Sequence, residues 1–128
     1  MLRNVPMAAR IAASDIGRAR AWYAEKLGLE PEHEEMGGIS LWYRTGDTWF
    51  LLYQTDAAGT ARNTVGGWEV KDLPAVMAEL RSRGVVFEEY DWGELKTVDG
   101  MMTIGNHRVA WFTDSEGNIL ELTENVGA

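Results

Sequence analysis

The chain has 128 residues, of which 45% are hydrophobic, so it is long enough to bury one sizeable core, and nothing in it suggests a second domain. Its formal net charge of -8 disfavours nucleic acid as a partner and would attract a cationic small molecule. Cysteine is absent, which excludes disulfides, thiolate metal sites and a cysteine nucleophile. No apolar run approaches the roughly 18 residues that a membrane span needs, so we expect a cytoplasmic protein without membrane contact.

The first half of the chain, about residues 7–56, opens with a short strand pattern followed by a helical pattern. Asp15 is placed to cap the helix, since its carboxylate can accept hydrogen bonds from the free amides of the first turn. Gly28 fits the left-handed position that closes a helix. Apolar residues recur at helical spacing between them and predict a stripe that covers a sheet: Ile16, Ala19, Trp22, Tyr23 and Leu27.

Three extended stretches complete this half. Residues 30–36 form the first, and residues 42–55 contain two runs of strand formers around Gly46 and Asp47, which is a strong hairpin signal. If these two residues form the loop, Tyr43 pairs with Phe50 and Leu41 with Leu52. The predicted order is strand, helix, strand, strand, strand.

The second half, about residues 63–124, repeats this order. Asp72 is the predicted helix cap, Pro74 falls in the first turn, where a missing amide costs little, and Gly84 closes the helix. The apolar stripe here contains Leu73, Val76, Met77 and Leu80. Residues 86–92 are predicted to be extended, and residues 114–117 form the turn of a second hairpin, in which Phe112 and Ala110 lie opposite Ile119 and Glu121.

The run WGELKTVDGMMTIGNH, residues 92–107, does not fit the repeat. A loop of this length in a small domain is often functional, and methionine side chains adapt to irregular apolar ligands. We therefore predict that Trp92, Met101 and Met102 touch a ligand or a partner subunit. The alternative is a β-hairpin with an exposed tip.

Two βαβββ units, with DIGRARAWYAEKLGL in the first and DSEGNILEL in the second, resemble the glyoxalase/bleomycin-resistance/extradiol-dioxygenase family, or vicinal oxygen chelate superfamily. The resemblance covers nearly all of the chain, from Met7 to Glu124. It implies one α+β domain over residues 1–128, in which two modules form a curled mixed sheet cup with helices outside. Many members are homodimers, so the resemblance also implies a homodimer.

In metal-dependent members the resemblance implies four ligands, one on the first and one on the last strand of each module. The corresponding residues here are Ala8, Leu52, Val65 and Glu121, of which Glu121 alone carries a donor atom. Because one carboxylate does not make a metal site, we predict neither a metal ion nor another cofactor. A displaced site that uses His33, His107 and a glutamate is the alternative.

Strand alternation sorts side chains between the two faces of a sheet. If the four ligand positions point into the cup, the same face also carries Arg10, Ala12, Leu41, Tyr43, Phe50, Gln54, Gly67, Glu69, Ala110, Phe112, Ile119 and Thr123. The opposite face would then pack under the helices with Trp42, Leu51, Tyr53, Trp68, Trp111, Leu120 and Leu122, whereas Trp49 stays open because it is close to a turn.

A mostly apolar cup with a few polar groups suits a flat, partly polar organic ligand. The predicted ligand-binding residues are Tyr43, Phe50, Leu52, Gln54, Glu69, Trp92, Met101, Met102, Phe112 and Glu121. The alternative is that the aromatic residues among them simply fill the cup as core.

The leading functional hypothesis is a metal-independent binding protein that sequesters an aromatic or cationic antibiotic or metabolite in a homodimer cleft without chemistry. The alternative is an isomerase or epimerase acting next to a carbonyl, with Glu69 or Glu121 as general base and Arg10 stabilising negative charge. A third possibility is an interaction module with no small ligand.

Overall fold

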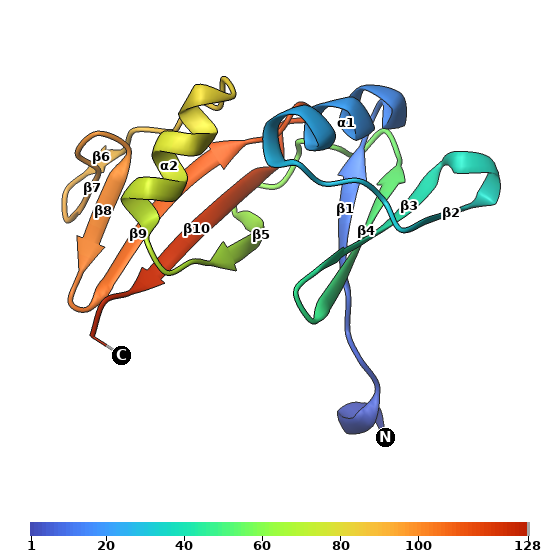
Figure 1. Cartoon of the computed structure of the whole chain (residues 1–128), viewed down its shortest axis with the longest axis horizontal. Helices are drawn as coiled ribbons and strands as arrows, with labels where there is room; N and C mark the ends of the chain where they lie inside the picture. Colours follow the sequence, from blue (N-terminus) through green and yellow to red (C-terminus); the bar gives the residue numbers. More distant parts are fainter. Residues whose placement is uncertain (128) are drawn as a thin grey trace.

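The computed structural model describes residues 1–127, which form two βαβββ modules (Figure 1). The first module contains β1 (Ala9–Ala13), α1 (Ile16–Trp22), β2 (His33–Glu35), β3 (Ser40–Thr45) and β4 (Thr48–Gln54), and α1 continues into one wide π-helical turn, Tyr23–Leu27. Short 3-10 turns cover Leu2–Asn4 and Met36–Gly38. The strand order is β1-β4-β3-β2, with β1 parallel to β4 and the other pairs antiparallel.

The second module repeats this topology. It contains β5 (Thr64–Glu69), α2 (Leu73–Ser82), β8 (Met101–Ile104), β9 (His107–Thr113) and β10 (Ile119–Asn125), in the order β5-β10-β9-β8. A small separate hairpin consists of β6 (Asp91–Trp92) and β7 (Leu95–Lys96). The predicted α+β fold of two βαβββ modules is therefore confirmed, and the two sheets remain open. None of the helices in residues 1–127 has the length and apolar character to cross a membrane.

The helix ends follow the capping rules. The carboxylate of Asp15 accepts a hydrogen bond from the amide of Arg18 at 3.0 Å, and that of Asp72 accepts one from Ala75 at 3.1 Å. Gly28 closes the first helix with φ of 69°, which is the left-handed region that favours glycine. These helix boundaries are confirmed.

The fourth strand of the second sheet is not where the sequence predicts it. Residues 86–92 make a single bridge to β9, at Phe87, and then leave the sheet to form the β6–β7 hairpin. The edge strand is β8, in which Met101 pairs with Ala110 and Met102 with Val109. The prediction for residues 86–92 is wrong because β8 supplies the four-residue pairing with β9, while Val86 and Trp92 stay exposed.

One hydrophobic core joins the helix-covered faces of the two sheets. Tyr23, in the π-helical turn, packs against Tyr43 and Phe50 of the first sheet, with ring centroids 5.8 and 6.1 Å apart. Trp22 stacks on Phe112 of the second sheet at 6.3 Å. The two modules therefore share their core across α1.

The turn between β9 and β10 fastens the second module to the first. Buried Asp114 accepts hydrogen bonds from the Tyr23 hydroxyl at 2.7 Å and from the amides of Glu116 and Asn118. The Asn118 side chain donates to the carbonyl oxygen of Ala12, in β1, at 2.7 Å. The DSEGN sequence thus holds its own turn and the start of α1 together.

Glu116 provides the charged contact of this turn. Its fully buried side chain accepts hydrogen bonds from Arg18 Nε at 2.8 Å, from the amide of Asp15 at 2.9 Å and from the hydroxyl of Ser14 at 3.1 Å. The hydrogen bond from the Arg18 guanidinium lowers the pKa of Glu116 from 4.5 to about 2, with smaller contributions from Asp15, Ser115 and Ser14. The carboxylate of Glu116 is therefore ionised in the folded protein at neutral pH.

Candidate ligand-binding site

In β3 and β4 of the first module the two faces are the reverse of those predicted, whereas Arg10 of β1 lies on the uncovered face, as predicted. Leu52 pairs with Ile11 and Leu51 with Arg10, so Leu52 lies on the face that α1 covers. Tyr43, Phe50 and Leu52 are at most 8% exposed, and with Leu41 they belong to the core. Their predicted orientation is wrong because the stripe of α1 with Tyr23 packs on this more apolar face. The predicted hairpin pairing, Tyr43 with Phe50 and Leu41 with Leu52, is confirmed.

In the second module the hairpin register differs by one residue from the prediction. Phe112 pairs with Leu120, and Trp111 pairs with Glu121. The five-residue turn 114–118, held by the side chain of Asp114, sets this register. Phe112 and Ala110 are consequently fully buried in the core, whereas Trp111 lies on the uncovered face with Glu121.

Each sheet keeps one face that no helix covers. Open face A, on the first sheet, carries Arg10, Trp42, Trp49, Leu51 and Tyr53. The Arg10 guanidinium carbon lies 5.4 Å from the centroid of the Trp42 ring, and His33 lies between Trp42 and Trp49 at 6.3 and 5.8 Å. The Trp42 indole donates a hydrogen bond to Glu35. The prediction that Trp42 packs under a helix is wrong.

Open face B, on the second sheet, carries Trp111, Glu121 and Thr123, with Glu69 beside Thr123. Tyr90 packs edge-on against Trp111, with centroids 5.4 Å apart, and Trp92 lies 5.0 Å from Tyr90. The predicted positions of Glu69 and Glu121 on the uncovered face are confirmed by this register. The face therefore combines an aromatic wall with two carboxylates.

Gly67 makes room for Glu121. A Cβ atom at Gly67 would lie 2.6 Å from Glu121 Cγ and 2.7 Å from its carbonyl oxygen, closer than real Cβ atoms come. The side chain of Glu121 therefore lies over the backbone of β5. No sequence pattern in the chain singled out this glycine as a neighbour of the carboxylate.

The remaining predicted ligand residues are dispersed. Gln54 accepts a hydrogen bond from the amide of Ile16 at 3.3 Å, at the start of α1. Met101 packs against the core. Met102 is 4% exposed and pairs with Val109, which pairs with Thr123, so it lies on the sheet side of open face B. Trp92, by contrast, is 72% exposed on the small hairpin, which is the hairpin of the alternative prediction. A ligand role for these residues stays a prediction.

The donor atoms on the open faces do not fit the metal set that the resemblance implies. Glu121 pairs with Gly67, and the equivalent pair of the first module is Leu51 with Arg10, so Leu51 and not Leu52 corresponds to Glu121. Leu51, Ala8 and Val65 all lack a donor atom. His33 lies on open face A and His107 at the start of β9, and in residues 1–127 no three His, Asp or Glu side chains gather closely enough for a metal ion.

Comparison with known proteins places the fold. A profile of the glyoxalase/bleomycin resistance protein/dioxygenase superfamily matches residues 6–126. A glyoxalase/bleomycin resistance protein from Catenulispora acidiphila has 22% sequence identity and a TM-score of 0.70, covering 94% of this chain and 98% of its own. TnmS3, an antibiotic binding protein from a Streptomyces species, has 21% identity and a TM-score of 0.65, covering 95% and 98%.

FosX, a fosfomycin resistance protein from Listeria monocytogenes in complex with manganese, has 14% identity and a TM-score of 0.67, covering 98% of this chain and 91% of its own. No curated protein matches. The solved structures show the shared fold, and the profile spans nearly the whole sequence. The chain therefore belongs to the glyoxalase/bleomycin resistance protein/dioxygenase superfamily.

Proposed function

We propose that the protein binds an aromatic or cationic organic molecule without a metal ion, in a cleft that two copies of the chain build together, and that it sequesters this molecule unchanged. The observation that carries the proposal is the aromatic lining of both open faces, with Trp42 and Trp49 on one and Trp111 on the other. Aromatic side chains on a surface that no helix covers supply area for a flat ligand.

The core that the two modules share supports a cleft formed by two copies of the chain. Because the covered faces of both sheets pack into one core through Trp22 and Tyr23, open faces A and B point away from that core. Open face A of one copy and open face B of another would supply the two walls, in a symmetric pair with two equivalent clefts.

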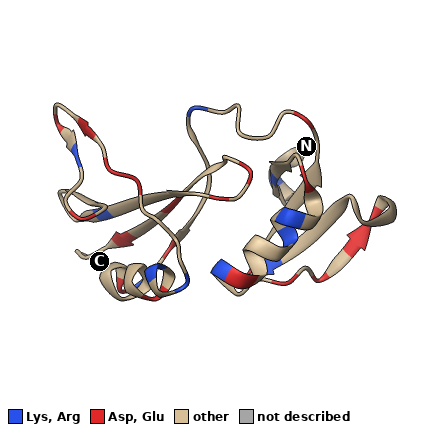
Figure 2. Ribbon diagram, turned by 90° about the horizontal axis from the view of Figure 1, so that it is seen from above, with Lys and Arg blue, Asp and Glu red and all other residues tan. Residues whose placement is uncertain are grey.

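Charge supports the ligand class. Glu69 and Glu121 place two carboxylates on open face B, and acidic residues lie on both modules (Figure 2), consistent with the net charge of -8. Stacking on Trp111 or Trp42 is worth about 1 kcal/mol per contact beyond the buried area. TnmS3, which shares the fold, is an antibiotic binding protein.

Binding of proflavine, a flat cationic aromatic compound, and of bleomycin tests the proposal. We expect quenching of tryptophan fluorescence, recovery of the compound unchanged by mass spectrometry, and at least tenfold weaker binding in Trp111→Ala and Trp42→Ala. Val86→Ala, at a residue 80% exposed outside both open faces, is the matched control. Unaltered affinity in both tryptophan variants, or no response to either compound, would contradict the proposal.

A general base is the second candidate role, and the position of Glu121 beside Trp111 favours it. A carboxylate on an aromatic wall can abstract a proton next to a carbonyl if the ligand is positioned over it. Arg10 lies on the other open face, so it joins Glu121 only in a cleft formed by two copies. Chemical change of a bound compound that Glu121→Gln abolishes while binding persists would favour the enzyme over the binding protein.

A further inference from the structure

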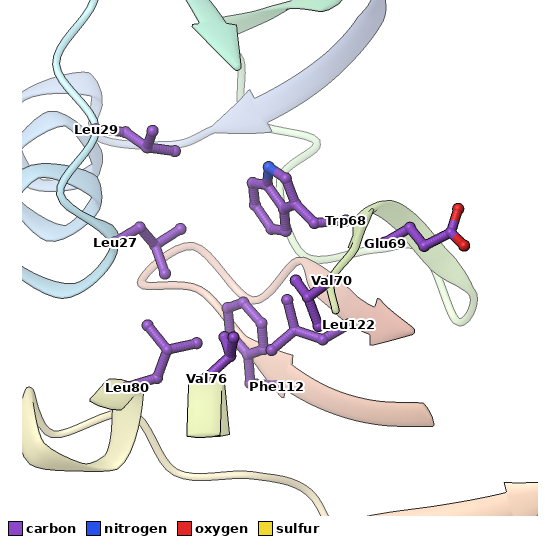
Figure 3. Close-up of a pocket in the computed structure, with 9 residues that line it drawn as sticks. All are labelled: Leu27, Leu29, Trp68, Glu69, Val70, Val76, Leu80, Phe112 and Leu122. Carbon is purple, nitrogen blue, oxygen red and sulfur yellow. The ribbon is translucent and has the colours of Figure 1, made fainter. Parts of the chain in front are cut away.

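A cavity of about 230 Å³ lies on the helix side of the second sheet (Figure 3). Leu27 and Leu29, which follow α1, form one wall. Val76 and Leu80 of α2 form the second, and Phe112 and Trp68 belong to the sheet. The cavity therefore lies where the two modules meet, with a contribution from each.

The chemistry of the wall is almost entirely that of hydrocarbon. Leucine, valine and phenylalanine side chains dominate it, and Trp68 presents a ring face. Glu69 contributes to the rim, but its carboxylate points away from the interior, as does the indole nitrogen of Trp68 (Figure 3). A polar or charged ligand would lose its hydration here without gaining a partner, which costs on the order of 1–3 kcal/mol for each unpaired group.

The size of the cavity selects the ligand further. An apolar cavity of about 150 Å³ stays dry and accepts benzene, so a cavity of about 230 Å³ has room for a second fused ring. The buried core next to it is closely packed, since Phe112 and Leu122 are at most 3% exposed. Leu27, Leu29 and Val76 are only partly buried, so the cavity opens to solvent along these side chains.

We propose that this cavity is a second ligand site, which takes a small uncharged aromatic molecule of about the size of naphthalene. Glu69 of open face B reaches the rim of the cavity, but Trp111, Glu121 and Trp42 do not line it, so the proposal rests on other residues than the open faces. Since the ligand touches both modules, it stabilises their mutual packing as well as the fold.

Naphthalene added to the full chain carrying 5-fluorotryptophan tests the site by fluorine NMR. The resonance of Trp68, assigned with Trp68→Phe, shifts in a saturable way, while the resonances of Trp111 and Trp42 stay in place. Saturation also raises the Tm, because the ligand binds the folded state. Trp68 lines the cavity and Trp111 and Trp42 do not, so a response at Trp68 alone is separable from binding at the open faces.

Two variants block the cavity by different means. Val76→Phe fills it, and Leu29→Asp places a carboxylate in its partly exposed wall, so each weakens naphthalene binding at least tenfold. Val86→Phe, the same enlargement at an exposed valine, leaves binding unchanged.

Three results would overturn the proposal. The first is the absence of saturable binding, and the second is binding by both blocking variants that equals that of the parent. The third is an affinity that falls as the protein concentration rises, since a second copy of the chain would then occupy the cavity.

Discussion

At the scale of single residues, the contact between Gly67 and Glu121 explains how a long carboxylate fits on open face B. A Cβ atom at Gly67 would meet both the side chain and the backbone of Glu121, and the backbone of β10 cannot move aside without disturbing its pairing with β9. Gly66 differs, because a Cβ atom there would meet Ile11 and Leu120 at an ordinary 3.5 Å. Two adjacent glycines therefore carry different constraints.

Gly67→Ala should destabilise the fold by about 1–3 kcal/mol, the typical cost of inserting a methyl group into a packed position. Gly66→Ala is the matched control and should stay close to the parent. Urea denaturation of the three proteins gives the comparison. Equal midpoints for Gly67→Ala and Gly66→Ala would show that β5 relaxes around the added methyl group.

At the scale of elements, the β9–β10 turn and the start of α1 behave as one unit through Glu116. The hydrogen bond from Arg18 outweighs the opposing effect of burial and leaves the folded-state pKa of Glu116 at about 2, below its ordinary 4.5. The unfolded chain therefore takes up this proton first as the pH falls. The stability that Glu116 contributes is therefore fully present above about pH 4.5 and is lost as the pH falls towards 2.

Glu116→Gln should lower the free energy of unfolding at pH 7 by about 1.5–3 kcal/mol, the usual range for a hydrogen bond to a charged group. The difference between parent and variant should shrink as the pH falls from 5 to 2. Glu79→Gln, at an exposed helix ion pair with Arg83, is the control and should show a small difference at every pH. A difference in the free energy of unfolding between the parent and Glu116→Gln that is constant with pH would contradict the role of the charge on Glu116.

The elements differ in how far the sequence predicts them. Helix caps and turns depend on neighbouring residues alone, so Asp15, Asp72 and Gly28 predict the helix ends. The pairing of Tyr43 with Phe50 likewise follows from a two-residue turn. Which face of a strand a helix covers does not depend on neighbouring residues alone. Both faces of β4 carry apolar residues, and only the packing of Tyr23 in three dimensions decides that Leu52 is covered and Leu51 is not.

The candidate site follows the same division. Glu69 and Glu121 could be assigned to one face from alternation, because β5 and β10 pair in register there. Trp111 could not, since the five-residue turn held by Asp114 shifts its partner by one residue. The side chain of Asp114 accepts hydrogen bonds from the amides of Glu116 and Asn118. The sequence Asp-x-Glu-Gly-Asn is therefore the signal that could have predicted this register.

At the scale of the whole molecule, the two modules share one core and one fastening turn, so neither is a separable unit. The helix of the first module packs on both sheets, and Asp114 and Glu116 of the second module bind Tyr23 and Arg18 of the first. Both open faces are then left for contacts outside the chain.

The outward direction of the two open faces allows complementation between defective chains. Trp42 and Trp111 lie on opposite walls of any cleft made by two copies, so a pair of Trp42→Ala and Trp111→Ala chains contains one cleft with neither substitution and one with both. After unfolding and refolding together, the mixture should bind proflavine at a fraction of its sites with the affinity of the parent. Refolding of each variant alone should give no sites with the affinity of the parent. If the mixture binds as weakly as the separate variants, each chain carries its whole site within itself.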